Sequence, residues 1–344
     1  MATRESAIID FTEAAYDLES EHDEWVRRLL AAGMPAFDQG LGMFALTAVR
    51  PPEPGPIRIA RVHAIAGQDA LAERVQELEQ QIDMRSLWPL GRPGAPKTLS
   101  EVAHDHDPAA FASIIRHFDF AEDALGLSAF DSTGWGVYLI TPLPKVTTLS
   151  ARARERWGML TAHLRAAHRL RRAIENQGLR RGAKTGLPLG AEAVIDASDF
   201  RIAEAAGRAT SRPALAALRD AAEQKDRARG HLRDSDPEKA LELWRALVRG
   251  RWSTVDWFDS GGRRYVLGIP NPPEVLDPRG LTEREMQVVS HAVLGITNKM
   301  IGYTLGVSPG RVSTLLGSAM KKLGVHTRAQ LIKRMTDFDP MVPR

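Results

Sequence analysis

The side chains best suited to binding chemistry lie in one row near the end of this 344-residue sequence. The row consists of Arg311, Ser313, Thr314, Gly317, Ser318, Lys321 and Lys322. Lysines neutralise phosphates, and small polar side chains let a helix lie deep in a groove. Arg311 is the residue of this row that can form bidentate hydrogen bonds to the edge of a guanine, and it can equally well contact a phosphate. The chemistry predicted for this row is therefore binding to a polyanion.

A second group of residues has the chemistry of metal ligands. In His104-Asp105-His106-Asp107 alternate side chains can project together, and His117 can join them. The same run is also a good helix start, because an aspartate cap precedes Pro108. We favour the helix start and predict no metal site.

Enzymatic activity has no support in the sequence. There is no cysteine, which excludes disulfides, thiolate zinc sites and cysteine nucleophiles. No phosphate-binding loop, response-regulator aspartate pocket or Ser-His-Asp arrangement is recognisable. We therefore expect no catalytic residues and no cofactor. An enzyme-like N-terminal half that turns over its ligand is a further alternative, but no set of catalytic residues supports it.

Local signals divide the C-terminal residues into four short helices. Glycines at 295, 306 and 324 can end the first three, since glycine adopts a left-handed conformation at little cost. Helix starts are predicted at the capping boxes Thr282–Glu285 and Thr327–Gln330 and at the caps Thr297 and Ser308. The second and third helices are separated by Gly306-Val307-Ser308, a turn tight enough to leave the third helix free to enter a major groove.

The charge distribution agrees with this interpretation. From Asp277 to Arg344 there are ten basic and five acidic residues, a net charge of +5, while the whole chain carries +3. The rest of the chain is therefore slightly negative, and the positive charge gathers where phosphates are expected.

The stretch LTEREMQVV…TNKMIGYTLGVS…RV…KKLGV.TRAQL, about residues 281–334, strongly resembles the LuxR-type (GerE-like) helix-turn-helix. The resemblance implies that Asn298 and Lys299 lie near the DNA backbone and that base-facing positions fall on the third helix. It also implies that the fourth helix pairs two protomers, through Leu331, Ile332 and Met335. The complete set of predicted DNA-binding residues is Asn298, Lys299, Ser308, Arg311, Ser313, Thr314, Gly317, Ser318, Lys321 and Lys322.

The sequence departs from the family at two places in the third helix. Arg311-Val312-Ser313 stands where the family usually has Thr-Val-Lys, and Leu315 stands where a histidine is usual. Serine, threonine and glycine make few bidentate base contacts, so the target sequence stays open.

The first 270 residues predict an α+β region. Expected helices cover 23–37, 69–82, 108–118, 150–177, 213–229 and 237–249, with strands at 42–49, 57–66, 123–130, 135–141 and 191–195 and a hairpin over 252–269. The segment 200–206 fits a strand or a helix, and 178–190 and 270–278 read as linkers. This order looks like GAF or PAS sensory modules, although no residue motif carries that likeness.

Two features of this region have alternative readings. The arginine-rich helix 150–177 resembles connecting helices that dimerise, or it packs on its own domain. Three tryptophans lie on predicted strands: Trp135, Trp252 and Trp257. They either line a ligand pocket or belong to a hydrophobic core, and a core position is the more common one for a tryptophan on a strand.

These observations predict a multidomain protein: an α+β, GAF/PAS-like domain over 1–177, a PAS-like domain over 190–270, and an all-α four-helix domain over 277–344. The expected function is a cytoplasmic, homodimeric transcription regulator that binds double-stranded DNA under control of a small-molecule ligand or protein partner. No apolar stretch reaches the ~20 residues that a membrane helix needs. The alternative is a protein-interaction adaptor whose DNA binding is weak or lost.

Overall fold

A computed structural model describes residues 6–51, 55–65, 73–75, 77, 96–105, 108–118, 120–131, 133–177, 185–271 and 281–336. The chain divides into two compact units, 1–168 with 335–344, and 169–334. Each unit contains one antiparallel four-stranded sheet.

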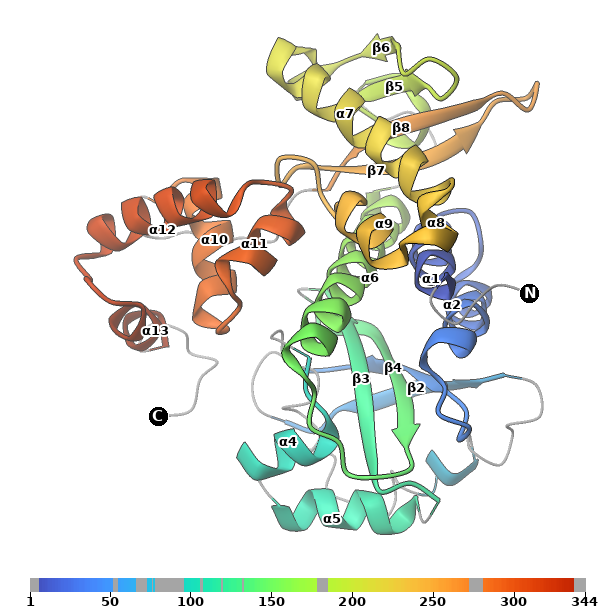
Figure 1. Ribbon diagram of the computed structural model, residues 1–344, viewed down its shortest axis with the longest axis vertical. Coiled ribbons are helices and arrows are strands. Elements are labelled where there is room, and N and C mark those ends of the chain that lie inside the picture. Colours follow the sequence, from blue (N-terminus) through green and yellow to red (C-terminus); the bar gives the residue numbers. More distant parts are fainter. Residues whose placement is uncertain are drawn as a thin grey trace. The chain divides into compact units, whose positions relative to one another are not determined.

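The sheet of the first unit has the order β2-β1-β4-β3 (Figure 1). Its strands are β1 (Phe44–Val49), β2 (Arg58–Ala64), β3 (Asp123–Phe130) and β4 (Trp135–Leu143). The hairpin of β3 and β4 was predicted, and it turns at Gly134, whose φ of +81° favours glycine.

Helices cover both faces of this sheet. On one face α4 (Leu99–Asp105) and α5 (Pro108–His117) bury Leu99, Val102 and Ile114 against Phe44 and Leu46 of β1. On the other face lie α1 (Ala7–Ala15), α2 (His22–Phe37) and the first part of α6 (Ala151–Gln177). There His22 of α2 reaches Thr47, which alternates with Leu46 along the strand.

The sheet of the second unit has the order β6-β5-β8-β7. Its strands are β5 (Ala193–Asp196), β6 (Ile202–Ala205), β7 (Trp252–Phe258) and β8 (Arg264–Pro270). The helix α7 (Arg212–Arg229) packs on it through Ala214, Leu218 and Ala222. The segment predicted as a strand or a helix is thus a strand, and the second predicted hairpin is confirmed.

The prediction of a helix over 237–249 is wrong in its second half. After the single turn of α8 (Leu232–Ser235), α9 (Pro237–Leu243) ends before Trp244, whose backbone is extended. Residues 246–248 are all buried, and three successive side chains cannot all face inward from a surface helix. The Trp244 carbonyl instead accepts a hydrogen bond from the Tyr303 hydroxyl.

The C-terminal helices are α10 (Glu283–Val293), α11 (Asn298–Leu305), α12 (Pro309–Leu323) and α13 (Arg328–Thr336). Val289, Ile301, Val312 and Leu331, one from each helix, are completely buried. The predicted linkers and the helix predicted over 69–82 lie largely outside the described residues.

Candidate nucleic-acid interface

The turn between α11 and α12 is built by glycines at positions where a side chain would not fit. Gly306 ends α11 with a φ of +63°, and a Cβ on Gly302 would lie 2.7 Å from the carbonyl oxygen of Val307. Ser308 then caps α12, because its hydroxyl accepts a hydrogen bond of 3.2 Å from the Arg311 amide. The predicted tight turn and cap are both present, and they fix the direction in which α12 leaves.

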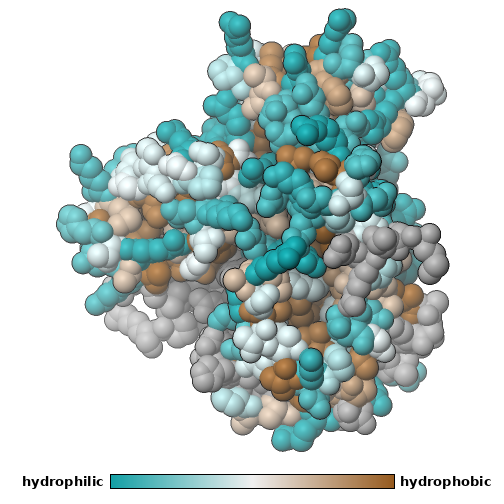
Figure 2. Space-filling view, in the orientation of Figure 1, coloured by the Kyte–Doolittle hydropathy of each residue, from teal (hydrophilic) through white to brown (hydrophobic). Residues whose placement is uncertain are grey.

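One face of α12 is buried and the other is open. Val312, Leu316, Ala319 and Leu323 face the core, as their helical spacing predicts. All the predicted DNA-binding residues of α12 and its cap are exposed: Ser308, Arg311, Ser313, Thr314, Gly317, Ser318, Lys321 and Lys322. Hydrophilic and neutral side chains cover the region of α12 in Figure 2. This face has the size, polarity and access of a helix that can enter a groove.

The hydroxyls in the middle of this face are already oriented. Ser313 and Thr314 each donate a hydrogen bond of 3.1 Å to a carbonyl one turn earlier in α12. Each hydroxyl thus uses its proton within the helix and is left with acceptor capacity, which suits the amino groups of adenine or cytosine. Asn298 of α11 donates a hydrogen bond of 3.0 Å to the Ser313 oxygen and so joins the two helices of the motif.

Gly317 leaves space in the exposed face. No atom lies within 4 Å of the position that a Cβ would take there. Packing within the protein therefore does not require a glycine here, although glycine is unfavourable within a helix.

Two of the predicted DNA-binding residues, Ser318 and Lys322, share an acidic partner within the chain. Glu285 of α10 accepts hydrogen bonds from Ser318 (2.5 Å) and Lys322 (2.7 Å) while its carboxylate also closes the capping box with Thr282. Burial favours the protonated acid, but these hydrogen bonds, first of all that of Lys322, outweigh it and lower the pKa of Glu285 to about 2. Lys321 has no acidic partner in the described part of the chain, so its charge is free for a phosphate.

The structure adds a basic residue that the sequence analysis missed. Arg284 is half-buried, and burial together with Arg251, Arg249 and Arg311 lowers its pKa to about 10. Arg311 therefore lies near a group of arginines that also contains one acid, Glu283, which pairs with Arg251 at 3.1 Å and offsets part of the positive charge. Arg251 and Arg249 come from the segment after α9, so no local sequence signal links them to Arg311.

The predicted dimerisation residues differ in exposure. Leu331 is completely buried within its own chain, whereas Ile332 and Met335 are half-buried. Arg328 at the start of α13 donates hydrogen bonds to the Ala292 and Ile296 carbonyls, which fixes α13 to the end of α10. Lys299, predicted near the DNA backbone, is exposed at the start of α11.

The other sequence candidates lie elsewhere. The side chains of His104, Asp105, His106, Asp107 and His117 are outside the described residues. Among the side chains that are described, no group of His, Asp or Glu residues is arranged to hold a metal ion.

The three tryptophans take different positions. Trp252 belongs to the core of the second sheet and donates a hydrogen bond of 2.8 Å to Glu192. Trp257 lies beside the Tyr265 ring, and Trp135 lies near His22.

Comparison with known proteins bears directly on this surface. Residues 279–335 match the family model of bacterial regulatory proteins of the luxR family, known as GerE. The chain carries a LuxR-family helix-turn-helix domain. The predicted resemblance is confirmed for this GerE domain, which contains every α12 residue discussed above.

The matching proteins are regulators by name. A segment of 98 residues is 33% identical to the nitrate/nitrite response regulator protein NarP of Escherichia coli (strain K12), covering 28% of this chain and 44% of NarP. A segment of 104 residues is 27% identical to the HTH-type transcriptional regulator MalT of Vibrio campbellii and of Vibrio parahaemolyticus, covering 30% of this chain and 12% of each MalT. The similarity thus spans less than half of each relative. In the described residues no helix is both long and apolar enough to cross a bilayer.

Proposed function

We propose that this protein is a sequence-specific DNA-binding transcription regulator whose helix α12 enters the major groove. The observation that carries the proposal is the open, polar face of α12 within a LuxR-family domain. In this proposal Ser313, Thr314 and Gly317 face the bases, while Lys299 and Lys321 contact phosphates. Arg284 adds positive charge beside Arg311.

The proposal extends to the rest of the chain. Residues 1–177 and 190–270 serve as GAF/PAS-like sensory domains, each built around one antiparallel sheet, and residues 277–344 form the DNA-binding domain. A ligand or a protein partner received by the sensory region controls binding in the cytoplasm. Two copies pair through the surface of α13 that carries Ile332 and Met335, so that two α12 helices meet one face of the duplex.

The decisive experiment selects bound duplexes from a random pool with the full chain. A shared motif is expected, and its affinity should fall steeply as salt concentration rises, because bound counterions are released. The variant Arg311→Lys then separates the two readings of this side chain. Loss of preference at one base pair indicates a guanine contact, whereas a uniform change for all duplexes indicates a phosphate contact.

A second variant tests the face of α12 itself. Gly317→Glu places a negative charge where no protein atom stands in the way, so the fold is kept while phosphates are repelled. We expect duplex affinity to fall about 100-fold or more, because like charges brought together cost several kcal/mol. Ala216→Glu, on the exposed side of α7, adds the same negative charge outside the GerE domain and should leave affinity unchanged.

The adaptor alternative has a clear signature. Absence of salt-dependent duplex binding by the wild-type chain, or equal binding by Gly317→Glu, would overturn the proposal and favour a protein-interaction role. The small residues Ser313 and Gly317 on α12 are also compatible with an adaptor.

A further inference from the structure

An apolar cavity lies inside the first unit, between the sheet and the helices α4 and α5. The centres of water molecules can occupy about 90 Å³ of it. One water needs roughly 10–15 Å³ on this measure, so a small organic molecule fits. Its walls are almost entirely apolar and include Phe44, Leu46, Ile114, Phe118 and Ile140. Apolar space of this kind receives apolar ligands more readily than it holds water.

One polar group on the cavity wall has no partner within the described part of the protein. Tyr138 of β4 lines the cavity, and its hydroxyl makes no hydrogen bond there. Tyr138 is only partly exposed, and burial alone raises the pKa of its phenol well above the usual value. A Cβ on Gly126, on the neighbouring strand β3, would lie 2.3 Å from the hydroxyl oxygen. Glycine at 126 therefore makes room for the phenol.

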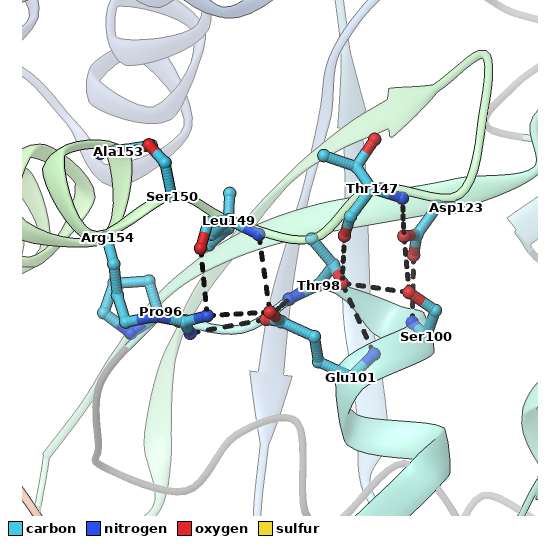
Figure 3. Close-up of polar contacts among 10 residues, drawn as sticks. All are labelled: Pro96, Thr98, Ser100, Glu101, Asp123, Thr147, Leu149, Ser150, Ala153 and Arg154. Atoms are coloured by element: carbon cyan, nitrogen blue, oxygen red, sulfur yellow. Dashed lines mark hydrogen bonds and ion pairs between the residues drawn. The ribbon is translucent and has the colours of Figure 1, made fainter.

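The other polar residue on the wall is fully occupied. The carboxylate of Asp123 accepts hydrogen bonds from the amides of Ser100, Ala124 and Thr147 and from the Ser100 hydroxyl, at 2.6 to 3.0 Å. Figure 3 shows this carboxylate held between the start of α4 and the segment that leads to α6. Asp123 thus offers a ligand no free hydrogen-bonding capacity, and its negative charge disfavours an anion.

The charge balance of the cavity restricts the ligand further. None of the described lining residues is a lysine, arginine or histidine. An ionised ligand would be buried without a counter-charge, at high cost in free energy. A neutral ligand with one acceptor meets both the apolar wall and the unpaired hydroxyl donor.

We propose that the first unit binds a small, neutral, predominantly apolar molecule in this cavity, with one carbonyl or ether oxygen accepting the hydrogen bond of the Tyr138 hydroxyl. Binding itself is independent of the role in transcription. Control of DNA binding by this ligand rests on the proposed function.

The network in Figure 3 offers a route for such control. Leu99 lines the cavity at the start of α4, and Glu101 in the same turn forms an ion pair of 2.7 Å with Arg154 of α6. A ligand that shifts α4 would therefore act on α6.

Three probes of nearly equal shape test the ligand class on the full chain without DNA. Acetophenone has a carbonyl oxygen, α-methylstyrene replaces that oxygen by a methylene group, and benzoate carries a negative charge. Saturation-transfer NMR with competition should rank acetophenone about five-fold tighter than α-methylstyrene, the difference that one hydrogen bond makes. Benzoate should show no binding.

Variants connect the binding to this cavity. Tyr138→Phe should abolish the preference for acetophenone over α-methylstyrene, whereas Tyr265→Phe, the same change on β8 of the second sheet, should keep it. Ala124→Leu fills the cavity and should abolish binding of both neutral probes, with circular dichroism as the check on folding. If Ala124→Leu does not fold, Gly126→Ala replaces it, because its methyl group drives the phenol into the cavity.

Several results would overturn the inference: no binding of either neutral probe by the wild-type chain, benzoate binding as tightly as acetophenone, or unchanged binding in the folded cavity-filling variant. Loss of DNA binding with intact probe binding would instead contradict the proposed function alone.

Discussion

The ammonium group of Lys322 lies 2.7 Å from the carboxylate of Glu285, the residue that closes the capping box of α10. The neighbouring Lys321 has no such acidic partner among the described residues. These two adjacent lysines of α12 therefore differ in whether an acidic side chain of the same chain pairs with them. Lys322 holds α12 to α10, while Lys321 keeps its full charge for a binding partner.

This difference predicts unequal effects on DNA binding. Lys321→Ala should weaken binding to all duplexes and lower the slope of log affinity against log salt by about one, the value for one lost phosphate contact. Lys322→Ala should lower the slope less, because Glu285 already neutralises part of its charge. Fluorescence anisotropy over a salt series measures both, and Lys145→Ala, an exposed lysine of the first unit, is the control. Equal slopes for the two variants would contradict the assignment.

Glu285 also predicts a pH dependence in the GerE domain. Its pKa of about 2 in the folded protein lies below the ordinary value of 4.5. The unfolded chain thus takes up a proton first as pH falls, so stability present above pH 4.5 is lost on the way to pH 2. Thermal unfolding followed through amide signals of α10 should show this loss in the wild-type chain and a smaller one in Glu285→Gln. A variant with the same acid sensitivity as the wild type would refute the role of this carboxylate.

A cluster of buried charges lies in the second unit, and removing one of its members should strongly lower the free energy of unfolding. Lys225 of α7 is only 2% exposed, and its ammonium lies 3.2 Å from Asp256 of β7, which also pairs with Arg229. Burial would raise the pKa of Asp256, but the two cations outweigh it and keep the pKa below its usual value. Asp256→Ala removes a carboxylate that pairs with the buried Lys225 ammonium and should cost about 3–5 kcal/mol of unfolding free energy.

Urea denaturation followed by tryptophan fluorescence measures this cost. Glu223→Ala removes an exposed ion pair with Arg219 on the same helix and should change stability by less than about 1 kcal/mol. If both variants lost a similar amount of unfolding free energy, burial of Lys225 would not be the reason for the cost of Asp256→Ala.

His63 predicts a second pH dependence, in the first unit. This residue is 5% exposed, and its ring shares the Thr47 hydroxyl with that of His22, at 2.8 and 3.0 Å. Burial, and then the charges of His22, Arg61 and Arg27, lower the pKa of His63 from 6.5 to about 4. Because the folded form resists protonation, stability present above pH 6.5 is lost as pH falls toward 4, by roughly 1–2 kcal/mol after a discount for solvent screening.

Thermal melts of the wild type and His63→Gln between pH 7 and 4 test this. The glutamine keeps a hydrogen-bonding side chain but does not titrate, so the melting temperature of the variant should change less with pH over this range. A steeper decline in the variant would show that another group is responsible.

The sequence by itself determined what depends on neighbouring residues. Capping boxes at Thr282–Glu285 and Thr327–Gln330, the serine cap of α12 and the glycine ends of α11 and α12 all form as predicted. The buried stripe of α12 follows from helical spacing, and the hairpins of β3–β4 and β7–β8 follow from apolar runs around a glycine turn. Such signals act within about one turn or one hairpin, where the chain itself sets the geometry.

The tertiary structure decided what depends on residues far apart in the chain. The end of α9 at Leu243 coincides with carbonyls bonded by Tyr303, 59 residues beyond Trp244. The pairing of Lys322 with Glu285, the arginines around Arg284 and the cavity hydroxyl of Tyr138 likewise join separate elements. Burial and charge at these sites come from packing in three dimensions, so the residue types alone carry no sign of them.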